Sequence, residues 1–310
     1  MARSLITLIG LALLSFGVNA GVRPITDLPL QADGPNHWRL PAGEYRGSFR
    51  IDQPLQLTCA PGALFQAEGQ GNGLLISAPD VSVQGCTFLD WGDDLTAMNA
   101  GVFIQPQARG AQLLGNRLQG QGFGIWVDGT QDVSLIGNRI QGDTSVRSQD
   151  RGNGIHLYAV HGARVIDNHV RDTRDGIYID TSNGNLLQGN TLEDLRYGIH
   201  YMFANDNQVL GNTTRRTRTG YALMQSRKLT VIGNRSEQDQ NYGILMNYIT
   251  YSTLQDNVVT DVRDGSTGDT MIAGGEGKAL FIYNSLFNRI EHNRFRSEEH
   301  TSELQSPPLS

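Results

Sequence analysis

The sequence has 310 residues, of which 38% are hydrophobic and 18% charged, with 37 glycines and a formal net charge of −6. The glycines follow no collagen period and β-branched residues are plentiful, so neither a collagen helix nor a disordered chain is indicated. The pI of about 5.6 excludes the basic footprint that nucleic-acid-binding domains carry.

Residues 1–20 have the features of a secretory signal peptide. A single early cation, Arg3, precedes an apolar stretch from Leu5 to Val18, and the segment ends in the small residue Ala20. This pattern predicts export of the protein and cleavage before Gly21. The apolar stretch is short for a membrane span, and a retained anchor is the alternative interpretation.

An asparagine closes a short apolar burst at regular intervals, most often 22 residues apart. These asparagines are Asn116, Asn138, Asn168, Asn190, Asn212, Asn234, Asn257 and Asn293. A glycine lies 14 residues before six of them and opens a segment of alternating apolar residues, such as GIYI at 176–179. Alternation is the periodicity of a β-strand, and a 22-residue unit of short strands is one coil of a solenoid.

The repeat therefore predicts an all-β fold, a single right-handed parallel β-helix of about ten coils over residues 48–296. Residues 21–47 are expected to form its N-terminal cap, since solenoid ends need covering. The asparagines are predicted to be structural, because Asn tolerates corner conformations and can pair from coil to coil.

Cys59 and Cys86 occupy the position of the asparagine in earlier, degenerate coils. Neighbouring coils can bring equivalent Cα atoms to ~4.4–6.8 Å, which is within disulfide reach. Export to an oxidising compartment favours a Cys59–Cys86 bridge. Two buried free thiols in place of asparagine are the alternative.

Three connections are longer than the usual 8 residues between the asparagine position and the next strand. They run from Cys86 to Gly101, from Asn138 to Gly154 and from Asn257 to Ala279. All three occupy the same turn of the coil, so they should emerge along one edge of the rod. Insertions on one face often mark the binding side, with neutral loop growth as the alternative.

The strand that follows this turn carries unusual residues on its outward face. Alternate positions along a strand point outward, and here they include the residues Trp126, His156, Tyr178, His200, Met202 and Met224. A solvent face favours Lys, Glu, Ser and Thr. Aromatic rings, histidine and methionine instead call for a covering loop or a partner.

His200, Met202 and Met224 are the candidate metal ligands. The first two lie two residues apart on one strand, and Met224 follows one coil later. Imidazole and thioether ligands favour Cu(I) over Mg²⁺ or Ca²⁺. His156 is a peripheral candidate, and Met98 and Met271 are further candidates in the inserted loops. The alternative is that both methionines pack under the 258–278 loop and that His200 bonds a carbonyl.

Residues 297–310 lack the repeat and resemble translated sequencing-adapter sequence. They are interpreted as a non-native tail, with a native disordered tail as the alternative. No cap is recognisable after Arg296, so the native β-helix is expected to be longer.

The segment RYGIHYMFANDNQVLGN at 196–212 resembles the NosD family of accessory proteins for nitrous-oxide reductase maturation. The resemblance covers residues 1–296, and its most specific positions are Gly198, His200, Tyr201, Met202, Asn205, Asp206 and Asn207.

This resemblance implies a non-catalytic periplasmic β-helix that binds copper transiently. It also implies docking on the ABC-transporter membrane subunit NosY, driven by the ATPase NosF, so that the membrane is reached only through partners. Copper would come from the chaperone NosL, and the recipient would be the nitrous-oxide reductase NosZ, whose copper–sulfide centre is assembled.

A carbohydrate-binding or carbohydrate-modifying β-helix is the main alternative function. Glycoside hydrolysis needs two carboxylates ~5–9.5 Å apart. Asp128 and Asp180 share the outward face, but an intervening coil separates them by about 9.6 Å. A sugar hydrolase or epimerase is therefore disfavoured, whereas Trp126, Tyr158 and Tyr178 could still stack on sugars.

Overall fold

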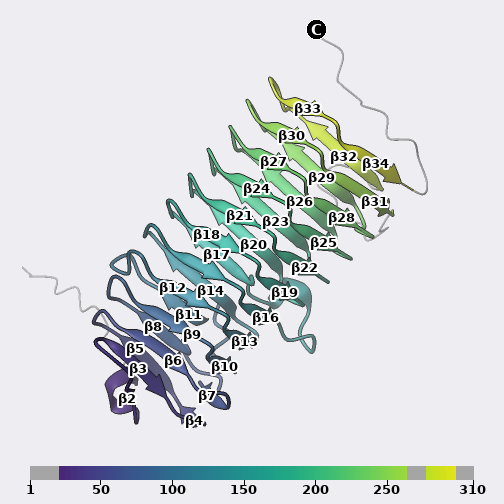
Figure 1. The fold of residues 1–310 in the computed structure, drawn as a ribbon. Coiled ribbons are helices and arrows are strands. Elements are labelled where there is room, and N and C mark those ends of the chain that lie inside the picture. The colour runs from purple at the N-terminus through teal and green to yellow at the C-terminus, as the bar shows by residue number, and fades with distance from the viewer. Residues whose placement is uncertain (1–20, 264–276, 298–310) are drawn as a thin grey trace, which may run out of the picture.

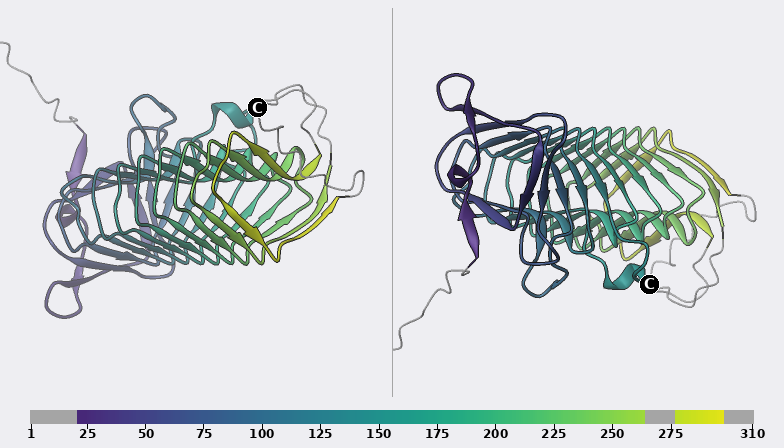
Figure 2. Two further views of the ribbon diagram at one scale, coloured as in Figure 1. Left: turned by 90° about the horizontal axis from the view of Figure 1, so that it is seen from above. Right: turned by 90° about the horizontal axis from the view of Figure 1, so that it is seen from below.

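The structure is a computed structural model that describes residues 21–263 and 277–297. These residues form β-strands and two single-turn 3-10 helices, η1 (Ile25–Asp27) and η2 (Ser148–Asp150). The coils lie one above another along a single axis, from the N-terminal to the C-terminal end (Figure 1). The turn that contains η2 projects from the side of this stack (Figure 2).

Three sheets run along the stack, and each coil contributes one strand to each sheet. Sheet A consists of β1 (Val22–Pro24), β5 (Ser48–Ile51), β8 (Leu74–Ile76), β11 (Ala100–Ile104), β14 (Phe123–Asp128), β17 (Ile155–Tyr158), β20 (Asp175–Asp180), β23 (Tyr197–Met202), β26 (Thr219–Met224), β29 (Tyr242–Asn247) and β32 (Lys278–Tyr283).

Sheet B follows sheet A within each coil. It consists of β2 (Gln31–Ala32), β3 (His37–Leu40), β6 (Gln56–Cys59), β9 (Ser82–Gln84), β12 (Gln112–Leu114), β15 (Ser134–Ile136), β18 (Arg164–Ile166), β21 (Leu186–Gln188), β24 (Gln208–Leu210), β27 (Thr230–Ile232), β30 (Thr253–Gln255) and β33 (Arg289–Glu291).

Sheet C completes each coil and leads back to sheet A. It consists of β4 (Gly43–Arg46), β7 (Ala63–Gln66), β10 (Thr87–Leu89), β13 (Arg117–Gln119), β16 (Arg139–Gln141), β19 (His169–Arg171), β22 (Thr191–Glu193), β25 (Thr213–Arg215), β28 (Arg235–Glu237), β31 (Val258–Val262) and β34 (Arg294–Ser297).

The prediction of an all-β parallel solenoid is confirmed. Every described strand pair is parallel apart from β2 with β3, which pair antiparallel at the N-terminal end. Within the segment predicted as the cap, β3 and β4 are already members of sheets B and C. Inside the solenoid, the register places similar side chains of successive coils side by side. Ile177 lies beside Ile199, for example, and both are fully buried.

The asparagines form a continuous ladder at the corner between sheets B and C, and it is buried from Asn116 to Asn257. From Asn138 onward, the side-chain oxygen of each one accepts hydrogen bonds from the backbone and side-chain amides of the asparagine one coil earlier, as Asn190 does from Asn168 at 2.9 and 3.0 Å. The side-chain amide also donates to a carbonyl, Val165 O in the case of Asn190, at 2.8 Å. Corner backbone groups that water cannot reach are thereby satisfied.

Cys86 stands at the first position of this ladder. Its backbone amide donates to the side-chain oxygen of Asn116 at 2.9 Å, as an asparagine there would. In the structure its thiol is joined to that of Cys59 in a disulfide, with Cα atoms 5.0 Å apart. The bridge closes a 27-residue separation in the early coils.

Candidate functional site

A row of outward-facing side chains runs along sheet A, one from each successive strand. In register from β11 to β32 the row consists of Phe103, Trp126, His156, Tyr178, His200, Ala222, Leu245 and Phe281. We call it the outer ladder. Although it lies outside the solenoid, it is largely covered, and His156 and His200 are each 6% exposed.

Aromatic contacts connect the first half of the outer ladder. The ring centroids of Trp126 and His156 lie 4.0 Å apart, and those of His156 and Tyr178 lie 4.6 Å apart. Tyr178 stacks on His200 at 4.3 Å with nearly parallel planes. The sequence-based expectation that this apolar strip is covered agrees with the burial, and each imidazole is held between neighbouring rings.

Two separate apolar clusters include residues at the two ends of the outer ladder. Leu95 and Met98, from the first inserted loop, pack against the cluster around Phe103 and Trp126. The second cluster is formed by Ala222, Met224, Tyr242 and Leu245, with Tyr197, Met202 and Phe281 against it. Met202 and Met224 therefore lie together, whereas Met98 belongs to another part of the face.

His200 is oriented by a buried carboxylate. Its Nδ1 lies 3.0 Å from Oδ2 of Asp175, which is on the previous strand and is fully buried. Arg196 binds the same carboxylate with two hydrogen bonds, of 2.8 and 2.6 Å. Burial alone would raise the pKa of Asp175, but the hydrogen bonds from His200 and Arg196 lower it to about 2.

The Asp175 carboxylate binds Nδ1 of His200 and leaves Nε2 without that hydrogen bond. Because an ionised Asp175 can only accept, Nδ1 of His200 donates to it, and Nε2 then carries the lone pair whenever the ring is neutral. Nε2 is buried and has no hydrogen-bond partner among the described residues. A histidine held at Nδ1 by a carboxylate and bare at Nε2 has the arrangement of a metal-ligating histidine.

His156 has the opposite tautomer. The side-chain oxygen of Asn153 accepts from the backbone amide of Asp175 at 3.3 Å, which fixes the orientation of that side-chain amide. The Asn153 nitrogen then faces Nδ1 of His156 at 3.2 Å and donates to it. Burial lowers the pKa of His156 to about 3, so the ring is neutral with its proton on Nε2. It presents no lone pair to a metal.

The thioethers of Met202 and Met224 are the soft groups nearest to His200 along the sheet. Met202 follows His200 by two residues on β23 and shares its outward face, and it is paired in register with Met224 on β26. Ala222, beside His200 on that strand, adds only a methyl group. Within residues 21–263 and 277–297, no three His, Cys, Asp or Glu side chains form a metal site, so a zinc-type site is not supported there.

The structure thus brings three of the predicted ligands onto one stretch of sheet A, and it separates the others. His156 is two strands from His200, and Met98 lies at the level of Trp126, three strands away. Met271 lies outside the described residues. Of the structural alternative, one part differs in the structure, since the partner of His200 is the Asp175 carboxylate rather than a carbonyl. The other part, packing of both methionines, agrees with the apolar cluster around Met224, while residues 264–276 of the loop expected to cover them lie outside the described residues.

Sequence reasoning missed Arg196, and it placed Asp175 in a turn before Gly176, whereas Asp175 begins β20. Asp175 directly precedes the strand glycine Gly176, where neighbouring repeats have Asn153 and Tyr197. A carboxylate at a position that the repeat buries is the signal that could have identified it, because buried charges are paired.

A family model described as "Periplasmic copper-binding protein (NosD)" matches residues 136–304, more than half of the chain. The chain belongs to the NosD family. The match extends into residues 297–304, within the stretch that sequence analysis interprets as a tail.

Two relatives of the NosD family are each named "Probable ABC transporter binding protein NosD". The protein from Stutzerimonas stutzeri is 69% identical over 92% of this chain, which covers 66% of that relative. The protein from Pseudomonas aeruginosa is 61% identical over 92% of this chain, which covers 67% of that relative. The chain therefore spans about two thirds of the length of these NosD proteins.

Solved structures share the fold of this NosD-family chain at low sequence identity. The periplasmic alginate epimerase AlgG has a TM-score of 0.50 at 14% identity, over 88% of this chain and 83% of its own. A PL6 alginate lyase in complex with a trisaccharide has a TM-score of 0.55 at 14% identity, over 84% of this chain and 63% of its own.

No helix in the described part of the chain is long and apolar enough to cross a membrane.

Proposed function

We propose that this chain carries Cu(I) as cargo at His200, Met202 and Met224, for the maturation of the copper–sulfide centre of nitrous-oxide reductase. The observation that supports the proposal is the buried Nε2 of His200, which has no hydrogen-bond partner among the described residues while Nδ1 is held by Asp175. Leaving a buried polar atom unpaired is costly, and a bound soft ion would offset that cost.

The chemistry of the three side chains suits transfer rather than storage. One imidazole and two thioethers are soft enough for Cu(I) but include no thiolate, which would hold the ion more tightly. Met202 is only half-buried, so it is the ligand through which the ion would enter and leave. Apolar side chains pack against both thioethers.

The partners follow from the proposed cargo and the family. We propose that a copper chaperone, NosL, supplies the ion and that apo-reductase, NosZ, receives it. The membrane subunit NosY and the ATPase NosF would anchor and drive the exchange. The name of the relatives, which describes them as ABC transporter binding proteins, supports such an association.

A Cu(I) competition titration under reducing conditions tests the proposal. His200→Ala, and separately Met202→Leu with Met224→Leu, are expected to weaken Cu(I) binding at least about tenfold, since each removes a ligand. Met→Leu conserves volume and should leave the fold intact.

Two variants serve as controls in that titration. Met246→Leu changes a methionine that is fully buried inside the solenoid on β29, and it should leave the affinity unchanged. His156→Ala should also retain binding, because that ring presents N–H rather than a lone pair. Wild-type affinity in the double methionine variant would overturn the proposed site.

A further inference from the structure

The large hydrophobic side chains that are exposed within the described residues gather at one corner of the solenoid. Two of them, Tyr158 and Tyr283, end strands of sheet A, and the others, Phe203, Tyr248, Tyr251, Leu286 and Phe287, lie between sheet A and sheet B. Six of the seven lie in the last coils. Exposed apolar side chains gathered on one part of a surface are typical of an interaction site.

Four of these aromatic residues, Phe203, Tyr248, Tyr251 and Phe287, have a backbone conformation that aromatic residues rarely adopt. Phe203 and Tyr248 have φ values of 53° and 56°, in the left-handed region, and are 53% and 51% exposed. Positive φ is the rule at this corner, where other coils have Gly129, Ala159, Thr181, Gln225 and Asn284. The turn therefore does not require an aromatic ring, and both rings stay about half exposed, although Tyr248 contacts Tyr283 at a centroid distance of 5.9 Å.

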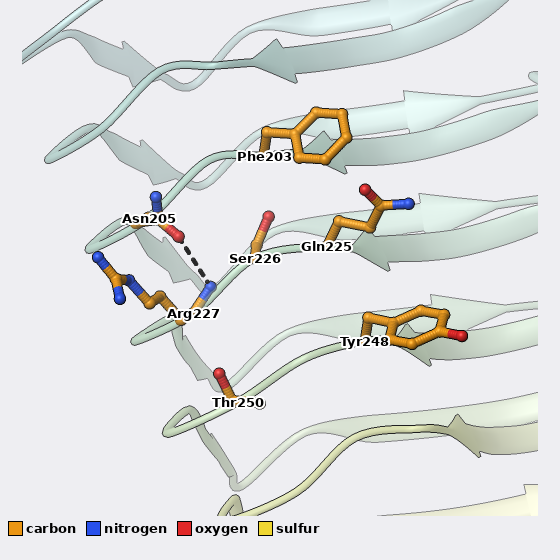
Figure 3. A pocket seen from close by; sticks show the side chains of 7 residues that line it. All are labelled: Phe203, Asn205, Gln225, Ser226, Arg227, Tyr248 and Thr250. Carbon is orange, nitrogen blue, oxygen red and sulfur yellow. Dashed lines mark hydrogen bonds between the residues drawn. The ribbon is translucent and has the colours of Figure 1, made fainter.

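Phe203 and Tyr248 form two walls of a hollow of about 470 Å³ (Figure 3). Gln225 lies between them on the intervening coil, and the three side chains stand in a row. Because the rings are two coils apart, their spacing along the solenoid axis is about 9.6 Å. The hollow therefore has two aromatic rings about 9.6 Å apart along the solenoid axis, with the polar side chain of Gln225 between them.

The polar groups of the hollow are mainly donors. The side-chain oxygen of Asn205 accepts from the backbone amide of Arg227 at 3.1 Å, which leaves its NH₂ group facing outward. The hydroxyl of Ser226 accepts from Ala204 N and donates to Met224 O, so it is already satisfied. The guanidinium of Arg227 adds further donors, and no carboxylate lines the hollow.

We infer that this hollow binds a proline-rich segment of a partner protein in the polyproline II conformation. Such a segment has three residues per turn and rises ~3.1 Å per residue, so one turn is about 9.3 Å and matches the spacing of the two rings. Proline carbonyls accept hydrogen bonds while proline nitrogens donate none, which complements a donor-lined surface. Aromatic-lined grooves are a recurrent way to bind this conformation.

Fluorescence anisotropy with a labelled polyproline peptide of about twelve residues, roughly four turns, tests the inference on the full chain. Saturable binding is expected. Phe203→Asn and Tyr248→Asn should each weaken it at least about tenfold. Since asparagine tolerates the left-handed region, both variants should melt at the wild-type temperature or above, which separates lost binding from lost folding.

Tyr251→Asn provides the matched control. Tyr251 has a φ of 54°, is 62% exposed and stacks on Phe287, but does not line the hollow. Its variant should bind the peptide as wild type does. The inference would be overturned by absent saturable binding, or by equal losses in all three variants. Tighter binding of a neutral glucan oligosaccharide with the same residue dependence would also overturn it and assign the hollow to carbohydrate.

Discussion

Replacing Asp175 by asparagine is expected to lower the free energy of unfolding by about 2–3 kcal/mol at pH 7. The carboxylate is fully buried and accepts from His200 and from both donors of Arg196. Its pKa is lowered from 3.8 to about 2 in the folded protein. Urea unfolding of wild type and variant measures the difference.

The pH dependence of that difference has a defined sign. Because the pKa of Asp175 is lower in the folded than in the unfolded chain, its contribution is present above about pH 4 and is lost as the pH falls toward 2. The difference in free energy of unfolding between wild type and the Asp175→Asn variant should therefore disappear between about pH 4 and pH 2. A gap that stays constant down to pH 2 would contradict the assigned ion pair.

Asp194→Asn is the control for the buried carboxylate. Asp194 makes the same two-bond contact with Arg216, at 2.8 Å for each bond, but both side chains are more than 40% exposed. Exposed pairs contribute little, so this variant should lose less than about 1 kcal/mol. Equal losses in the two variants would show that burial is not the cause.

The same Asp175→Asn variant should weaken Cu(I) binding by about 10–100-fold, a prediction that rests on the proposed copper site. The asparagine side chain at position 175 does not keep the proton of His200 on Nδ1 as the carboxylate does. Nε2 is then not kept free to bind the metal. The nitrogen chemical shifts of the imidazole, measured by NMR without copper, should show the change of tautomer. An unchanged tautomer with weakened binding would contradict this explanation.

Replacing Asn190 by alanine is expected to lower the free energy of unfolding by about 3–5 kcal/mol. Asn190 is fully buried within the asparagine ladder. Its loss leaves the backbone amide of Asn168 and the carbonyl of Val165 without their partners, and water cannot replace them there. Each unsatisfied buried group costs ~1–3 kcal/mol. Urea unfolding at neutral pH is the measurement.

Asn293→Ala is the matched change at the last position of the same ladder. Asn293 also accepts from the asparagine before it, at 2.9 Å, but it is only half-buried. Water can satisfy the freed groups in part, so a loss of about 1–2 kcal/mol is expected. A loss at Asn293 equal to that at Asn190 would contradict the role assigned to burial.

The spacing of glycine and asparagine was sufficient to predict the solenoid, the buried corner ladder and the inward or outward direction of each sheet A residue. The physical reason is that a strand alternates its faces and a coil repeats its length, so one unit determines the environment of the next. The same periodicity placed His200, Met202 and Met224 on one outward face, where the structure also has them.

The hydrogen-bond partners of the two imidazoles and the residues that line the corner hollow were decided only by the tertiary structure. Asp175 meets His200 across 25 residues of sequence, and Asn153 fixes the tautomer of His156 through a backbone contact to Asp175. Burial, hydrogen-bond direction and pKa depend on which neighbours the coil register brings within 3 Å or so. Residue spacing reports which face a side chain occupies, but it does not report what that side chain donates to or accepts from.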